Sequence, residues 1–189
     1  MRIGLYGGSF NPPHAAHVMV SETALRRLNL DRVWWLVTPG NPLKDTDGLP
    51  PASERIAAAR DIISDKRIVP TDIETRLGTR YTADTLEKLA GRAPGVRFVW
   101  LMGADNLLQF DRWRNWRGIA GSMPIAVFDR PGFGERALRS KAALALASHR
   151  IDETDGRVLA DLRAPAWTFI HGPLSNLSST ALRAKTSRS

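Results

Sequence analysis

The chain has 189 residues, of which 43% are apolar and 24% are charged, and its formal net charge is +8. This length suits one compact domain over residues 1–189, and the apolar share is too high for a disordered protein. The lack of cysteine excludes disulfides and thiolate metal sites, and no segment approaches the roughly 18 consecutive apolar residues of a membrane span. We expect a cytosolic protein without a membrane partner.

The basic character is compatible with two classes of anionic partner, a nucleic acid or small phosphorylated molecules. A nucleic-acid interface typically gathers Arg, Lys and aromatic residues on one surface. Here the basic residues are spread along the chain in pairs such as Arg26-Arg27 and Lys66-Arg67. This distribution favours a solvated basic surface, and we expect no nucleic-acid partner.

Short β-branched or aromatic runs alternate with longer segments of helical pattern along the chain. Strands are predicted over residues 2–6, 32–37, 68–71, 97–102, 125–128 and 166–170. Helices are predicted over residues 14–28, 53–64 and 82–90, briefly from 104, and over 135–148, whereas 148–164 is expected on the surface. The alternation predicts an α/β fold, a single Rossmann-like doubly wound domain with a mostly parallel sheet.

The first predicted strand leads into Gly7-Gly8-Ser9-Phe10-Asn11-Pro12-Pro13-His14-Ala15-Ala16-His17. Ligands of open α/β sheets bind beyond the carboxyl ends of strands, and glycines there let the backbone approach a ligand closely. His14 and His17 are expected on one side of the first helical turn, where free N–H groups already attract phosphate. Alternatively, the glycines form a simple turn, and the histidines cap the helix, pack on the surface or bind a metal.

This segment resembles the His-x-x-His signature of the nucleotidylyltransferase superfamily, and within it the bacterial nicotinate-nucleotide adenylyltransferases. That family shows Gly-Gly-Ser/Thr-Phe-Asp/Asn-Pro-x-His-x-Gly-His here, whereas this chain has Ala16 at the usual Gly. The resemblance implies that His14 and His17 are catalytic and contact the ATP phosphates, with His17 stabilising the reacting α-phosphate. The implied ATP-binding residues of this segment are Gly7, Gly8, Ser9, Phe10, His14 and His17.

A second segment, Leu177-Ser178-Ser179-Thr180-Ala181-Leu182-Arg183, reads as the capped start of a helix. Hydroxyls, free amides and a forked guanidinium together form a cradle for phosphate, although Ser-Ser-Thr alone is an ordinary cap. The segment resembles the superfamily's Ile-Ser-Ser-Thr-x-Ile-Arg signature. The resemblance implies that Ser178, Ser179, Thr180 and Arg183 bind the β- and γ-phosphates of ATP.

Three segments bear on the acceptor nucleotide. Lys44 follows the second predicted strand where the family often has Pro-His-Lys/Arg, but Leu43 replaces the His. Arg80-Tyr81-Thr82-Ala83-Asp84-Thr85-Leu86 resembles the family's Ser-Tyr-Thr-x-x-Thr-Leu, and Thr82 at a helix start leaves amides free for a carboxylate. Arg130, in a segment similar to the family's Arg-Pro-Gly turn, is a candidate for the acceptor phosphate. A solvent-facing Lys44 and a simple cap at Thr82 are the alternatives.

Residues after the fourth predicted strand add to both substrate sites. Gly103-Ala104-Asp105 resembles the family's Gly-x-Asp, so Gly103 and Asp105 are expected to line the nucleotide site, with Asp105 near a ribose hydroxyl. Trp113 matches the family's aromatic that stacks on the pyridine base. Two tryptophans three residues apart, Trp113 and Trp116, are otherwise typical of a core.

The resemblance implies that the phosphate of nicotinate mononucleotide attacks the α-phosphorus of ATP. Pyrophosphate leaves and nicotinate adenine dinucleotide forms, without a general base or a covalent enzyme intermediate. Mg²⁺ is expected to arrive with ATP, because the sequence shows no carboxylate cage and no metal site of the protein's own. The alternatives are transfer to nicotinamide mononucleotide or phosphopantetheine, transfer of CMP to a phosphorylated alcohol, and, from another class, nucleic-acid binding.

Overall fold

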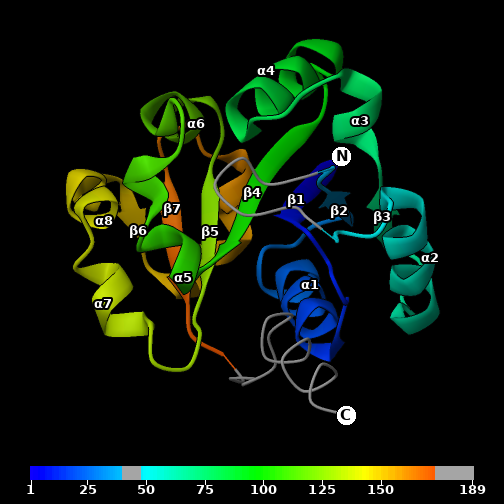
Figure 1. Cartoon of the computed structure of the whole chain (residues 1–189). Helices are drawn as coiled ribbons and strands as arrows, with labels where there is room; N and C mark the ends of the chain where they lie inside the picture. Colours follow the sequence, from blue (N-terminus) through cyan, green and yellow to red (C-terminus); the bar gives the residue numbers. More distant parts are fainter. Residues whose placement is uncertain (40–47, 173–189) are drawn as a thin grey trace.

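The computed structural model describes residues 1–39 and 48–172, in which seven strands form one sheet of order β3-β2-β1-β4-β5-β7-β6 (Figure 1). All neighbouring strands are parallel. The strands are β1 (Arg2–Gly8), β2 (Arg32–Val37), β3 (Ile68–Thr71), β4 (Arg97–Gly103), β5 (Ile125–Phe128), β6 (Arg150–Ile151) and β7 (Trp167–Ile170). The strand order reverses between β1 and β4, and such a switch opens a crevice at the carboxyl ends of both strands.

Helices cover both faces of this sheet (Figure 1). The helices are α1 (Ala15–Arg27), α2 (Ala52–Ile62), α3 (Ile73–Leu77), α4 (Thr82–Arg92), α5 (Ala104–Leu107), α6 (Trp116–Ser122), α7 (Gly134–Leu138) and α8 (Lys141–Ala145), with 3-10 turns at Phe110–Arg112, Ala147–His149 and Glu153–Asp161. α1, α2 and the turn at Glu153–Asp161 pack on one face, and α3 to α8 on the other. The predicted doubly wound α/β fold is confirmed.

The sequence of β4 shows why both faces are covered. Phe98, Trp100 and Met102 enter the core beneath α4 and α6, whereas Val99 and Leu101 enter the core beneath α1. Successive side chains of a strand point to opposite faces, so a continuous apolar run requires cover on both. No helix in residues 1–39 and 48–172 has the length and apolarity to cross a membrane.

Two of the predicted elements differ from the structure. The helix expected over 135–148 is two short helices, because Ser140 has an extended backbone and its hydroxyl accepts from the Ala143 N–H at 3.3 Å, which starts α8 afresh. Residues 148–164, expected to be irregular surface, contain β6 and a long 3-10 turn. A strand of two residues is too short to produce a visible alternation of apolar and polar residues.

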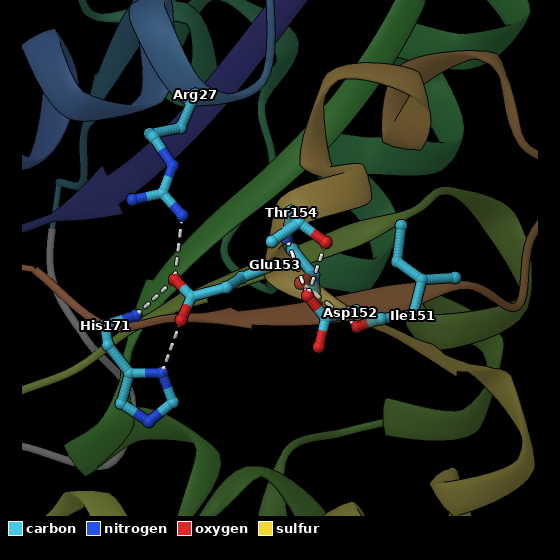
Figure 2. Close-up of polar contacts among 7 residues, drawn as sticks. Arg27, Ile151, Asp152, Glu153, Thr154 and His171 are labelled. Carbon is cyan, nitrogen blue, oxygen red and sulfur yellow. Dashed lines mark hydrogen bonds and ion pairs between the residues drawn. The ribbon is translucent and has the colours of Figure 1, made fainter.

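Glu153, after β6, joins α1 to the end of β7 (Figure 2). One carboxylate oxygen accepts from the Arg27 guanidinium at 2.9 Å and from the His171 backbone N–H at 3.1 Å, and the other lies 2.9 Å from Nδ1 of His171. Desolvation raises the pKa of the Glu153 carboxyl, but the His171 hydrogen bonds and the Arg27 charge outweigh it and hold the pKa below its usual value. The ionised carboxylate therefore stabilises the fold.

We predict that Glu153→Gln lowers the free energy of unfolding by about 1 kcal/mol at pH 7, since these contacts are partly exposed. The folded-state pKa is depressed, so this contribution exists above the unfolded-state pKa of the carboxyl and disappears as the pH falls through the folded one. Urea unfolding of both proteins at pH 7 and pH 3 measures the difference. The same change at Glu87, an exposed carboxylate of α4, is the control.

Candidate active site

The strands β1 and β4, which flank the switch point, both end in glycine. A Cβ at Gly7 would lie 2.6 Å from the Trp100 ring, and one at Gly103 would lie 2.4 Å from Oδ1 of Asp105. At Gly7 the clash is with a buried indole ring and favours glycine, whereas at Gly103 a Cβ would require the Asp105 carboxylate to move. A Cβ at Gly8 would meet the Phe10 ring at 3.2 Å, a tight contact that a small shift relieves. The space beside these three glycines is occupied by the side chains of Trp100, Phe10 and Asp105.

Phe10 turns the chain from β1 toward α1. Its φ of 47° is in the left-handed region, which is costly for a bulky residue and persists only where the surroundings enforce it. The ring is 1% exposed and stacks on Trp35 with centroids 4.6 Å apart and planes at 4°. Because the ring is buried between Trp35 and His17, it stabilises the position of His17. Any contact of Phe10 with a ligand is therefore through its backbone.

The structure brings His14 and His17 together at the start of α1, as their spacing predicts. Their rings stack with centroids 3.7 Å apart, and they are 6% and 8% exposed. Nδ1 of His17 accepts from the His14 backbone N–H at 3.2 Å. Neither ring nitrogen of His14 has a hydrogen-bond partner among the described residues. Buried polar atoms are rarely left unpaired, so these nitrogens indicate a place where a ligand supplies the partner.

Both imidazoles are neutral at pH 7. Burial, then the charge of Arg130, lowers the pKa of His14 to about 4, and burial, then His14 and Arg130, lowers the pKa of His17 to about 2. A neutral imidazole carries one proton, and Nδ1 of His17 acts as an acceptor, so the hydrogen-bond pattern assigns the proton of His17 to Nε2. His17 is thus a neutral hydrogen-bond donor held in a fixed orientation.

His17 is held in place by aromatic rings and by a hydrogen-bonded chain. Tyr6, Phe10 and Trp35 surround it with ring centroids at 6.0, 4.9 and 5.7 Å. Nε1 of Trp35 donates to Oγ of Ser21 at 2.7 Å, and that hydroxyl donates to the His17 carbonyl at 2.9 Å. These hydrogen bonds connect the first turns of α1 to β2, and they restrict the orientation of the His17 imidazole.

Arg130, after β5, lies beside the histidine pair. Its guanidinium donates to Oδ2 of Asp105 at 2.8 Å, and its charge lowers the pKa of both His14 and His17. Oδ1 of Asp105 is buried and has no partner among the described residues. The sequence suggested Arg130 for the acceptor phosphate. The structure places it with Asp105 and the histidines, where it faces the groups predicted to bind ATP.

The start of α4 and the segment before α6 lie side by side, as the contacts of Arg114 show. Its guanidinium is 3.3 Å from Asp84 and 4.6 Å from the centre of the Tyr81 ring. Thr82 begins α4, and the side chain of its N-cap residue, Tyr81, makes no capping hydrogen bond. Trp113 is half-buried and meets Trp100 edge-on, with ring centroids 6.3 Å apart. Trp116, by contrast, is buried in the core.

Known proteins resemble this chain over nearly its whole length. Residues 5–185 match the family model described as cytidylyltransferase-like. The probable nicotinate-nucleotide adenylyltransferase of Methylorubrum extorquens (strain PA1) is 60% identical over 98% of this chain and 100% of its own length. The probable nicotinate-nucleotide adenylyltransferase of Rhizobium meliloti (strain 1021) is 59% identical over 97% of this chain and 98% of its own length. The chain belongs to the nicotinate-nucleotide adenylyltransferase family.

A solved member has the same fold. The Plasmodium falciparum nicotinic acid mononucleotide adenylyltransferase complexed with NaAD superposes with a TM-score of 0.72 at 20% identity, covering 97% of this chain and 82% of that one. At this identity the likeness concerns the architecture. The family assignment itself follows from the sequence relatives, and it confirms the resemblance carried by the two motifs.

Part of the predicted adenylyltransferase site lies outside the described residues. This part comprises Lys44 with Leu43, and the second motif with Ser178, Ser179, Thr180 and Arg183. The described chain ends at Gly172, two residues beyond β7. Since all seven strands are parallel, the carboxyl end of β7 is at the same edge of the sheet as Gly7 and Gly103. Over residues 1–39 and 48–172, no group of three or more His, Asp or Glu side chains could hold a metal ion.

Two buried charged residues at this edge were not predicted from the sequence. Arg55 of α2 is 3% exposed and Glu74 of α3 is 7% exposed. Burial raises the pKa of the Glu74 carboxyl, whereas hydrogen bonds from Thr38 and Thr85 act in the opposite direction. For Arg55 a signal existed, because Arg55, Ile56 and Ala59 fall on one helical face and the last two are apolar. Nothing in the residue types around Glu74 distinguishes it from a surface carboxylate.

We predict that buried, neutral His14 makes the protein sensitive to acid. The pKa of His14 falls from its ordinary value of 6.5, which applies to the unfolded chain, to about 4 in the folded state. Between these values the unfolded chain binds more protons, so stability falls as the pH falls. His14→Gln removes this site, and the loss of unfolding free energy between pH 7 and pH 4.5 becomes smaller by about 2 kcal/mol.

Urea unfolding at the two pH values tests this expectation. The matched control is His149→Gln, which changes an exposed imidazole on the turn after α8 and is expected to leave the decline unaltered. An equal decline in His14→Gln and wild type contradicts the prediction.

Proposed function

We propose that this protein transfers the AMP moiety of ATP to nicotinate mononucleotide, releasing pyrophosphate and forming nicotinate adenine dinucleotide in NAD biosynthesis. The observation that carries the proposal is the pair of buried, neutral, stacked imidazoles at the start of α1, beside Arg130 and at the switch point of the sheet. The names of relatives at about 60% identity support the same reaction. The substrates are therefore two small phosphorylated molecules.

The chemistry requires little of the protein beyond positioning. An oxygen of the acceptor's 5′-phosphate bonds to the α-phosphorus of ATP, the bond from that phosphorus to the bridging oxygen of the β-phosphate breaks, and pyrophosphate leaves with the electron pair. The attacking phosphate is already ionised at neutral pH, so no general base takes part. Catalysis comes from holding two anions in line and stabilising the charge that develops between them.

His17 is proposed to donate from Nε2 to an oxygen of the α-phosphate. A neutral donor with a fixed ring needs no reorganisation when charge develops in the transition state. His14, with two unpartnered ring nitrogens, is proposed to bind the phosphates alongside it. The remaining proposed ATP contacts are Gly7, Gly8, Ser9, the Phe10 backbone, Gly103 and Asp105, together with Ser178, Ser179, Thr180 and Arg183.

The acceptor is proposed to lie between α4 and Trp113. The free amides at Thr82 offer donors and a positive dipole end to the nicotinate carboxylate, and the half-buried Trp113 offers an aromatic face to the pyridine ring. Lys44 and Arg130 are the proposed partners of the acceptor phosphate. The charge of Arg130 also acts on both histidines, which supports a place for its guanidinium near the phosphates.

Mg²⁺ is proposed to enter with ATP, bound by the phosphates and water. Bound in this way, the ion supplies charge neutralisation to the triphosphate.

We predict that His17→Ala lowers kcat about 100-fold, because a donor to the reacting phosphate is lost. Pyrophosphate release from ATP, Mg²⁺ and nicotinate mononucleotide measures the rate, and circular dichroism checks that the variant is folded. His149→Ala, which removes an exposed imidazole, should keep the wild-type rate. A His17→Ala rate within a few-fold of wild type would rule out the role given to His17.

We also predict that kcat/KM for nicotinate mononucleotide exceeds that for nicotinamide mononucleotide by about 10-fold or more. The reason is that free amides at a helix start favour a carboxylate over a neutral amide. A panel that also includes phosphopantetheine, with pyrophosphate as the readout, separates the members of the superfamily. Preference for the amide or for phosphopantetheine would replace the proposed acceptor.

A further inference from the structure

Arg55 of α2 connects three separate segments of backbone. Its guanidinium donates to the carbonyl of Ser9 at 2.6 Å, to that of Thr38 at 2.9 Å and to that of Pro50 at 2.8 Å. Ser9 follows β1, Thr38 follows β2, and Pro50 immediately precedes the turn into α2. We refer to these three contacts as the Arg55 clamp.

The clamp acts on two loops that already touch. The backbone N–H of Thr38 donates to the Gly8 carbonyl at 3.1 Å, continuing the β1–β2 pairing by one residue. The Thr38 side chain hydrogen-bonds the buried carboxyl of Glu74. Thr38 is thus held from the β1 loop, from α2 and from α3. Arg55 completes this arrangement, since it alone of these residues reaches the carbonyls of both Ser9 and Thr38.

An arginine is unusual in this position. Its side chain is almost fully buried, and burial lowers its pKa, so the cation loses hydration that only good hydrogen bonds offset. A guanidinium has five N–H donors in a rigid plane and can face three carbonyls at once. An ammonium group on a flexible stem has no such planar geometry. The Arg55 clamp therefore depends on the planar arrangement of the guanidinium donors and not on the positive charge alone.

The two loops held by the clamp carry different substrates in the proposed function. Ser9 begins the segment that carries the histidine pair, and Thr38 begins the connection whose sequence contains Lys44, a predicted acceptor contact outside the described residues. We propose that Arg55 is a positioning residue, whose fork fixes these loops relative to each other and so sets the alignment of the acceptor phosphate with the α-phosphorus of ATP. This inference rests on the proposed function, and it assigns Arg55 no contact with either substrate.

The test compares Arg55→Ala and Arg55→Lys in the full chain, with Arg60→Ala as the matched control on the exposed face of the same helix. We expect kcat of Arg55→Ala to fall about 30-fold, because small errors in the alignment of two reactants are costly. The dissociation constants of ATP and of nicotinate mononucleotide, each measured alone by calorimetry, should change less than 3-fold. Arg55→Lys should not recover kcat, whereas added methylguanidinium should partly restore Arg55→Ala. Arg60→Ala should match wild type.

The outcomes separate this proposal from the one on which it rests. Wild-type protein that forms no dinucleotide from nicotinate mononucleotide refutes the proposed function. If wild type is active, the positioning role is refuted by an Arg55→Ala rate within 3-fold of wild type. It is equally refuted if Arg55→Lys recovers the full kcat of wild type. A third refuting result is a loss of rate in Arg55→Ala that matches the unfolded fraction measured by circular dichroism and is not rescued by methylguanidinium.

Discussion

The packing of Phe10 against Trp35 determines where the chemistry of this protein can occur. The flat contact between these rings holds a backbone turn that a large residue seldom adopts, and that turn carries the chain from β1 into α1. His17 lies on Phe10, and His14 lies on His17. The histidine pair is thus connected through Phe10 to rings of the core, and dense packing there restricts where the imidazoles can lie.

Burial also determines the electrostatic character of the site. A site proposed to bind polyphosphate would be expected to display cations, yet the imidazoles of His14 and His17 are neutral. Among the described residues, the positive charge beside them comes from Arg130, which is paired with Asp105. Because both imidazoles are neutral, the protein can bury the histidine pair without placing two like charges next to each other.

Much of the fold could be predicted from the sequence, because long apolar runs bounded by glycine, proline and charge produce clear strands. All six predicted strands occur, and the first motif falls where the sheet reverses its order. Two short elements, α6 and β6, could not be predicted. α6 has two glycines in seven residues and β6 is two residues long, so neither has a periodic signal, and tertiary packing decides their structure. Of the candidate site, the histidine pair and Asp105 were identified by motif. The apolar face of α2 gave a signal for the burial of Arg55, but its bonds to three distant carbonyls and the burial of Glu74 depend on tertiary contacts that no local pattern records.

The bonds of Arg55 have a consequence for how this site can vary among related chains. All three of its acceptors are main-chain oxygens, which every amino acid possesses. Exchanges at positions 9, 38 and 50 that preserve the backbone path therefore leave these bonds intact, even where they alter what the loops recognise. Arg55 itself cannot be exchanged without losing these bonds, since no other side chain presents five donors in one plane. The three bonds therefore tolerate sequence changes in the loops as long as residue 55 remains an arginine.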